Sequence, residues 1–154
     1  MLQVKNSNRW LAIGLTALAV SIFAFTGCEP DPMVNPDDTP DPNWALTVEN
    51  DMTSSMTAVV KVFFASQPGT LAAFIGNDCC GIAEYKAEYG LYWLYISPTK
   101  AMTNDQSQTT NVVLRFYSPD LKRIFVAKDT FQYTNNGCLG SPSAPYPPEW
   151  TVDK

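Results

Sequence analysis

The chain has 154 residues, of which 45% are hydrophobic and 12% aromatic, so it has room for one packed domain and is not expected to be disordered. Its formal net charge is −5, and beyond residue 28 it carries 15 acidic against 8 basic side chains with no basic cluster, which argues against nucleic acid as a partner. It contains no histidine, which excludes His-dependent catalytic triads and the commonest zinc ligand.

Residues 1–27 have the layout of a secretory signal peptide. Lys5 and Arg9 give the segment a basic start, and an apolar stretch, Trp10–Phe25, follows them. A membrane-spanning helix needs roughly 20 apolar residues, and this stretch is shorter. We therefore expect the segment to be removed as a signal peptide rather than kept as a membrane span.

The junction Gly27-Cys28 resembles the lipobox of bacterial lipoproteins, in which a peptidase cuts before the cysteine. Phe25 stands where leucine is usual in that motif. The resemblance implies that Cys28 is the first residue of the mature chain and carries a diacylglycerol on its thiol. Two or three acyl chains give stable attachment to a membrane, so the expected partner of this end is a bilayer.

Residues 28–43 are predicted to be a linker. The stretch "EPDPMVNPDDTPDPN" holds five prolines and five acids without a base, a composition that favours extended polyproline II structure. Fully extended, it could reach about 45 Å. Glu29 and Asp31 follow the lipidated cysteine directly, which resembles the signal that exports lipoproteins of Bacteroidetes to the outer face of the outer membrane. The resemblance implies an outer-membrane protein that faces outward, and a periplasmic orientation is the alternative.

Residues 44–154 are predicted to form one all-β domain. Runs rich in Val, Ile, Phe, Tyr and Thr alternate with Gly, Pro, Asn and Asp, as strands alternate with turns. The expected strands are Ala45–Glu49, Met56–Phe64, Leu71–Gly76, Gly81–Tyr85, Leu91–Ser97, Thr110–Tyr117, Arg123–Ala127 and Thr130–Tyr133. About seven to eight short strands at this spacing predict an antiparallel β-sandwich of immunoglobulin-like type, with a small β-barrel as the alternative.

Three cysteines, Cys79, Cys80 and Cys138, remain once Cys28 is assigned to lipid. No Cys-x-x-Cys motif or histidine accompanies them, so a metal or redox site is not expected, and neither is a cofactor. In an oxidising compartment they predict one structural disulfide, Cys80–Cys138. The alternative is Cys79–Cys138.

The choice between the neighbours Cys79 and Cys80 rests on the strand that precedes them. If Ala73 and Ile75 point inward, the alternation of side chains places Cys79 in the core and leaves Cys80 to meet Cys138. The opposite orientation of the strand would reverse this choice.

Four segments, "MTAVVKV", "LAAFIGNDCCGIA", "VVLRFYSPDLKRIF" and "GCLGSPSAP", follow one another between Met56 and about Pro145. Their order is similar to a module of surface and secreted proteins of Bacteroidetes. Relatives in that family often carry a basic residue where Cys80 stands here. The resemblance implies an extracytoplasmic β-sandwich that acts as an accessory or binding module, and it brings no catalytic residues.

We therefore expect a non-enzymatic module that binds glycan or protein. Trp44 and Trp150 flank the domain and are the candidate binding residues, because flat aromatic faces stack on sugars and anchor interfaces. Trp93 lies within "GLYWLYIS", which is apolar on both faces, and is expected in the core. The alternatives are a structural subunit of a surface assembly joined through edge strands and, less favoured, a glycan hydrolase.

Acidic and amide side chains supply the only other candidates for chemistry. Carboxylates of the hydrolase alternative would come from Asp78, Glu84, Glu88 or Asp105. The pairs Asn77-Asp78 and Asn104-Asp105 offer oxygen ligands for calcium, but neither has the spaced carboxylates of a calcium loop, and turn formation explains both.

Overall fold

The computed structural model of the chain describes residues 37–49, 53–100, 102 and 110–153. The predicted signal peptide, Cys28 and the first part of the predicted linker lie outside these residues. Within them the strands are β1 (Met56–Val60), β2 (Thr70–Ile75), β3 (Asp78–Ile82), β4 (Glu84–Lys86), β5 (Leu91–Ile96), β6 (Asn111–Ser118), β7 (Arg123–Ala127), β8 (Phe131–Gln132), β9 (Cys138–Leu139) and β10 (Trp150–Val152).

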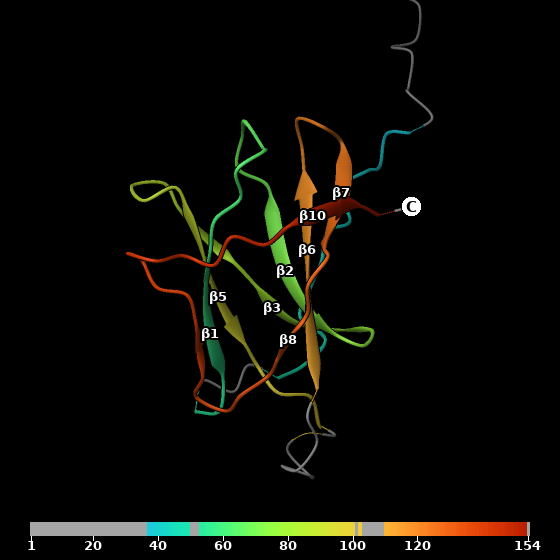
Figure 1. Ribbon diagram of the computed structural model, residues 1–154. Coiled ribbons are helices and arrows are strands. Elements are labelled where there is room, and N and C mark those ends of the chain that lie inside the picture. The colour runs from blue at the N-terminus through green and yellow to red at the C-terminus, as the bar shows by residue number, and fades with distance from the viewer. Residues whose placement is uncertain (1–36, 50–52, 101, 103–109, 154) are drawn as a thin grey trace, which may run out of the picture. The chain divides into compact units, whose positions relative to one another are not determined.

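The strands form two sheets (Figure 1). The smaller sheet has the order β4-β5-β1-β9 and the larger has the order β10-β7-β6-β2-β3, with β8 paired to β6. All pairs are antiparallel except β1 and β9, which run parallel. The sheets do not close into a barrel, so the predicted all-β sandwich is confirmed.

The hydrophobic core lies between the sheets and follows the alternation of side chains along each strand. In β6 the side chains of Val112, Leu114 and Phe116 are buried in the core, as the period of two in "TNVVLRFY" predicts. Phe116 joins the two sheets, because its ring centroid lies 5.7 Å from that of Tyr92 on β5 and 6.0 Å from that of Trp150 on β10.

Several predicted strand boundaries differ from the structure. Ala45–Glu49 is not a strand, and Met56–Phe64 ends as a strand at Val60 because the chain leaves the sheet there to cross to β2. The run Gly81–Tyr85 spans parts of two strands, β3 and β4, which belong to different sheets. The short strands β9 and β10 were not predicted.

Gly81 marks the place where the chain passes from one sheet to the other. A Cβ atom at this position would lie 2.5 Å from the backbone oxygen of Tyr95, so only glycine allows β3 to come this close to β5. The amide of Ser97 donates a hydrogen bond of 2.9 Å to the backbone oxygen of Cys80 beside it.

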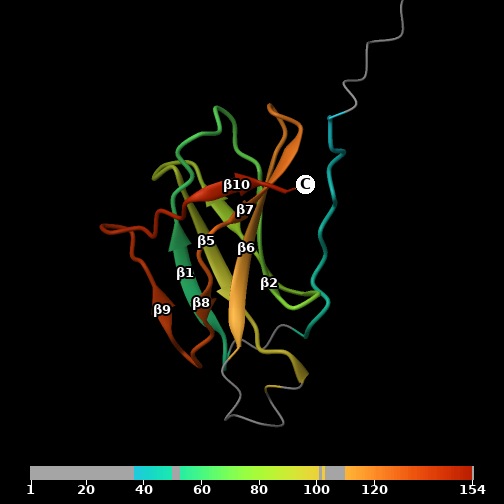
Figure 2. The ribbon, with the colours of Figure 1, turned by 45° about the vertical axis from the view of Figure 1, so that its right-hand side comes forward.

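Residues 37–49, which we call the N-terminal strap, run along the larger sheet (Figure 2). At one end the Thr39 amide donates to the oxygen of Lys122 at 2.7 Å, and at the other the Thr47 amide donates to the oxygen of Cys79 at 3.0 Å. Asp38 pairs with Lys122 at 3.0 Å. The last part of the predicted linker is therefore packed against the domain, which begins earlier than the predicted boundary at Trp44.

Candidate functional site

Cys79 and Cys80 point to opposite faces of the larger sheet, but in the reverse sense to the prediction. Cys80 is buried in the main core with Ala73 and Ile75, whereas Cys79 lies in a second cluster on the outer face with Ala72 and Phe74. The inward orientation assumed for Ala73 and Ile75 was therefore right. The alternation of inward and outward side chains along β2 nevertheless does not predict the faces of the two cysteines in β3.

The two-residue turn of the β2–β3 hairpin accounts for this reversal. Gly76, whose φ is 61°, and Asn77 form the turn, so Ile75 lies opposite Asp78 and Phe74 lies opposite Cys79. Directly opposite residues share a face of the sheet, which places Cys79 outward with Phe74 and leaves Cys80 inward with Ala73. Strand periodicity applies only within one continuous strand, and this turn separates Ala73 from both cysteines.

The predicted disulfide Cys80–Cys138 is absent from the structure, in which the thiols of Cys79, Cys80 and Cys138 are all free. Cys80 is enclosed in the core, while Cys138 is exposed on the edge strand β9 beside Thr57. A disulfide requires Cβ atoms about 4 Å apart that point toward each other. The thiols of Cys79 and Cys138 likewise face away from the core on different sheets, so the alternative pairing is not formed either.

Burial makes the two neighbouring thiols unreactive. Loss of solvent raises the pKa of the Cys80 thiol to about 11 and also raises the pKa of the Cys79 thiol. The thiolate is the nucleophile and the metal ligand, and at neutral pH neither group forms it to a useful extent. Both cysteines serve as small hydrophobic residues.

We predict that one thiol of the native protein reacts rapidly with a maleimide or with Ellman's reagent. The chain from residue 29 onward should show one fast equivalent, at Cys138, and two equivalents that react only after denaturation. Cys138→Ser should remove the fast equivalent and leave the two slow ones. A native protein without a fast thiol, and with a peptide that links Cys138 to Cys79 or Cys80, would restore the disulfide prediction.

Trp150, one of the two candidate binding residues, is part of the core packing. Its ring lies 6.0 Å from that of Phe116 and 6.1 Å from that of Phe64 by ring centroids. Its indole Nε1 is buried and has no hydrogen-bond partner among the described residues. Trp150 is therefore a partly buried residue that packs against the main core.

Trp44, the other candidate, holds the strap on the larger sheet. Its ring meets that of Phe74 edge-on at a centroid distance of 5.6 Å, and it packs against the second hydrophobic cluster. Arg115 lies over the other part of this cluster, with its guanidinium carbon 4.9 Å from the Phe74 ring centroid. The outer face of the larger sheet is thus covered by the chain itself.

Among the described residues, the outer face of the smaller sheet carries exposed aromatic side chains that sequence reasoning missed. On β5 the side chains of Tyr92, Leu94 and Ile96 enter the core, so those of Trp93 and Tyr95 point outward. Tyr95 is 44% exposed and Trp93 is half-buried. One feature of the sequence could have predicted this face: "GLYWLYIS" is apolar on both faces, and a two-layer sandwich can bury only one of them in its core.

Side chains of the neighbouring strands β1 and β4 surround these two rings with one buried apolar residue and several polar groups. Val59 on β1 and Glu84 on β4 lie directly opposite Trp93, and Thr57 lies opposite Tyr95. Val59 is buried, whereas Glu84 is exposed and forms an ion pair with Lys86. We call the outward side chains of Thr57, Val59, Glu84, Lys86, Trp93 and Tyr95 the Trp93 face.

The Trp93 face has the make-up of a recognition surface. It combines two aromatic rings two positions apart on one strand, about 7 Å along the sheet, with a hydroxyl, a carboxylate and an ammonium group. Flat rings supply apolar contact at low entropic cost, and the polar groups supply directed hydrogen bonds. The Trp93 Nε1 atom is buried and has no hydrogen-bond partner among the described residues, so the part of the side chain open to a ligand is its ring rather than this donor.

Comparison with protein families, curated proteins and solved structures finds no match to this chain. The assignment of a function therefore rests on the geometry of the chain itself.

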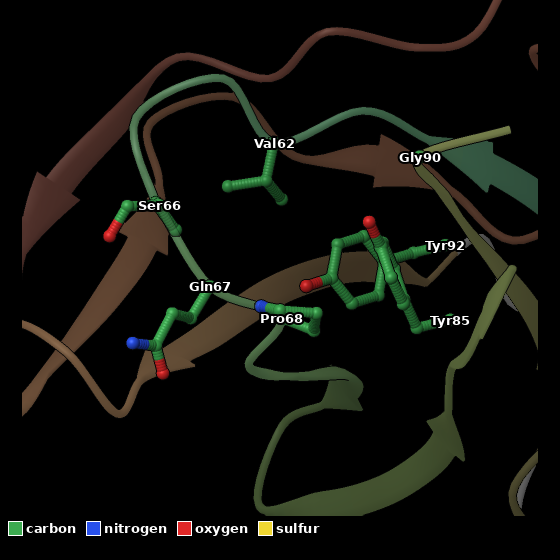
Figure 3. Close-up of a pocket in the computed structure, with 8 residues that line it drawn as sticks. Val62, Ser66, Gln67, Pro68, Tyr85, Gly90 and Tyr92 are labelled. Carbon is green, nitrogen blue, oxygen red and sulfur yellow. The ribbon is translucent and has the colours of Figure 1, made fainter. Parts of the chain in front are cut away.

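A pocket with about 310 Å³ of open space lies between the β1–β2 loop and the β4–β5 hairpin (Figure 3). Its wall is the pair Tyr85 and Tyr92, whose ring centroids are 4.9 Å apart, together with Val62 and Pro68. The hydroxyl of Tyr92 already accepts a hydrogen bond of 2.9 Å from the Gly69 amide.

The polar groups of this pocket do not converge on its centre. In Figure 3 the side chains of Ser66 and Gln67 point away from the tyrosine rings. The Ser66 hydroxyl and amide are both engaged by Asp120 on the β6–β7 turn. A ligand site normally needs several converging polar groups to fix orientation, and this pocket lacks them.

The acidic candidates Asp78 and Glu84 are engaged with neighbouring side chains in the described part of the chain. Asp78 accepts a hydrogen bond of 3.3 Å from the hydroxyl of Thr47, and Glu84 is paired with Lys86. In the residues that the structure describes, no group of three or more acidic or cysteine side chains could hold a metal ion. Asn104 and Asp105 lie outside these residues.

Membrane spans were sought over the same described residues. There, no helix has the length and apolarity needed to cross a membrane.

Proposed function

We propose that the chain is a lipid-anchored, non-enzymatic lipoprotein of the outer membrane that faces outward and binds a glycan on its Trp93 face. The lipobox resemblance at Gly27-Cys28 supports the anchor, and the acids at Glu29 and Asp31 support the outward orientation. The observation that carries the binding role is the pair of outward rings, Trp93 and Tyr95, on the open face of the smaller sheet.

The chemistry around the two rings favours a glycan over a protein partner. A sugar ring has an apolar face of C–H groups that can stack on Trp93 or Tyr95, and a rim of hydroxyl groups that needs nearby donors and acceptors. Thr57, Glu84 and Lys86 provide such groups within the same face. The core of a protein interface is instead depleted of charged side chains, and here an ion pair adjoins Trp93.

Assembly through sheet edges, the alternative of a structural subunit, has less support. The outermost strands β4 and β10 have three residues each and β9 has two, and short edge strands resist pairing with other chains. The remaining edge, β3, is covered, because its oxygens at Cys79 and Cys80 accept hydrogen bonds from Thr47 and Ser97.

We predict that Tyr95→Ala weakens glycan binding about tenfold, since loss of one stacking contact is worth about 1.4 kcal/mol. The measurement is retention of the chain from residue 29 onward on a panel of insoluble plant, fungal and bacterial cell-wall polysaccharides, followed by titration with a soluble fragment of any that retains it. Tyr89→Ala is the matched control, because Tyr89 is also an exposed tyrosine but lies in the turn after β4.

Two outcomes would contradict the proposal. Equal losses in Tyr95→Ala and Tyr89→Ala would place the binding surface elsewhere. Retention by none of the polysaccharides, together with a defined protein ligand whose affinity depends on Tyr95, would keep the Trp93 face as the site but make its partner a protein.

A further inference from the structure

Large apolar side chains are exposed mainly at one end of the sandwich. The most exposed of them among the described residues are Phe63, Tyr89 and Leu121, at 68%, 60% and 45%. Each lies in a different connection: Phe63 between β1 and β2, Tyr89 between β4 and β5, and Leu121 between β6 and β7.

These three connections lie together because β1, β4 and β6 all run toward the same end. In Figure 1 the connections after β1 and β6 are at the top of the view, and the one after β4 is at its upper left. Asp120 joins two of them through its hydrogen bonds with Ser66, whose amide lies 3.1 Å from the carboxylate. Hydrogen bonds from Ser118 and Ser66 lower the pKa of Asp120 to about 2, so this connection persists at every physiological pH.

The turns at the opposite end have a different character. Their described residues are 53–55, 76–78, 97–100 and 133–137, and most of these are Ser, Thr, Asn, Asp or Gly. No large hydrophobic side chain is exposed among them. Among the described residues the turns of the two ends therefore differ, and we call them the apolar end and the polar end; near the polar end Leu46 of the strap, beside Thr47, is 44% exposed.

The described chain begins at the apolar end. Asp37 and Asp38 pair with Arg123 and Lys122 at 3.4 Å and 3.0 Å, directly beside the turn that holds Leu121. Only eight residues, 29–36, separate Asp37 from Cys28. Their full extension spans at most about 32 Å, so a lipid on Cys28 would tether the domain at its apolar end.

We infer that the apolar end rests on the lipid surface, with Phe63, Tyr89 and Leu121 in its interfacial layer. This inference rests on the proposed lipid anchor at Cys28. Aromatic side chains favour the boundary between headgroups and acyl chains, and the anchor raises the local concentration of the surface, so weak contacts suffice. Lys61, which lies 5.1 Å above the Phe63 ring, can interact with headgroup phosphates.

The charges of this end indicate a zwitterionic rather than a strongly anionic surface. Lys122 and Arg123 are partly neutralised by Asp38 and Asp37, and Glu88 adjoins Tyr89. Seated in this way, the domain would keep the Trp93 face at its side, clear of the bilayer, and direct its polar end outward.

The test uses the mature chain from Cys28 with Cys138→Ser, so that Cys28 can be coupled to a maleimide lipid in phosphatidylcholine vesicles. Coupling should slow backbone hydrogen exchange at least severalfold in residues 61–69, 87–90 and 119–122 relative to the uncoupled chain. The triple variant Phe63→Ser, Tyr89→Ser, Leu121→Ser should lose this protection. The matched control is Leu46→Ser, Ile82→Ser, Tyr95→Ser, which removes three other exposed apolar side chains and should keep it.

Absence of protection in these three segments, or equal loss of protection in both triple variants, would overturn the inference. Protection of residues 53–55 and 97–100 instead would place the polar end on the membrane and overturn it too. Because the chemical tether replaces biological lipidation, a failure here is distinguishable from a failure of the anchor itself, which shows as missing acyl label on Cys28 in cells.

Discussion

Replacement of Gly69 by alanine is expected to destabilise the domain by about 2 to 4 kcal/mol. A Cβ atom at this position would lie 2.0 Å from the backbone oxygen of Tyr117 and 2.6 Å from the ring of Phe116, both of which belong to the packed interior. Overpacking of a dense core costs about 1–3 kcal/mol. Displacement of the backbone would also break the hydrogen bond from Gly69 to Tyr92, a further loss of about 1 kcal/mol.

The measurement is the free energy of unfolding in urea, with the thermal midpoint as a second readout. Gly90→Ala is the matched control: Gly90 has a φ of 63° and open space around it, so alanine meets only the backbone penalty of about 1 kcal/mol. A loss at Gly69 no larger than the loss at Gly90 would show that the β1–β2 loop does not pack against β6 as described.

The strands that could be predicted are those in which one periodicity extends over the whole element. In β6 the alternation of Val112, Leu114 and Phe116 with polar or partly exposed neighbours identifies both the strand and its inward face. β5 and β7 were predicted at or within one residue of their observed bounds because turn residues flank their apolar runs. Continuous apolar alternation is a local property, and local properties can be read from a single sequence.

The elements that could not be predicted depend on contacts between distant parts of the chain. β9 and β10 have two and three residues and form only because β1 and β7 offer them free edges. The break between β3 and β4 comes from the close approach of Gly81 to Tyr95, which no local pattern announces.

The tryptophans show the same limit for the candidate site. Trp93 was expected in the core because it lies in an apolar strand, and Trp150 was expected near the surface because it lies beside prolines. The structure leaves both partly buried, but it packs Trp150 against the main core beside Phe116 and Phe64 and turns Trp93 to the outer face of the smaller sheet. Burial is decided by which face receives a covering segment, and a sequence pattern does not contain that information.

The exchanged roles of Cys79 and Cys80 have a related cause. The condition that Ala73 and Ile75 point inward is met, but the alternation does not continue unchanged through the two-residue turn at Gly76 and Asn77. This turn places Phe74 opposite Cys79, and opposite residues share a face, so the two cysteines exchange sides. The disulfide prediction was wrong because Cys80 is enclosed in the core, whereas Cys138 is exposed on β9 at the edge of the smaller sheet.

Replacement of Cys28 by alanine is expected to abolish lipidation completely. The lipobox resemblance makes the Cys28 thiol the acyl acceptor, and without the diacylglycerol the lipoprotein peptidase has no substrate, so an uncleaved precursor should accumulate without acyl label. Acyl chains contribute about 0.8 kcal/mol of membrane binding per buried CH₂ group, and the acidic domain cannot replace this contribution by attraction to anionic lipid.

The measurements are metabolic labelling with a fatty acid and the apparent mass of the chain. Cys138→Ala is the matched control, because Cys138 is an exposed cysteine outside any lipobox and its loss should leave both labelling and cleavage unchanged. Normal maturation and normal labelling of the Cys28→Ala chain would refute the anchor, and with it the membrane-seated orientation of the apolar end.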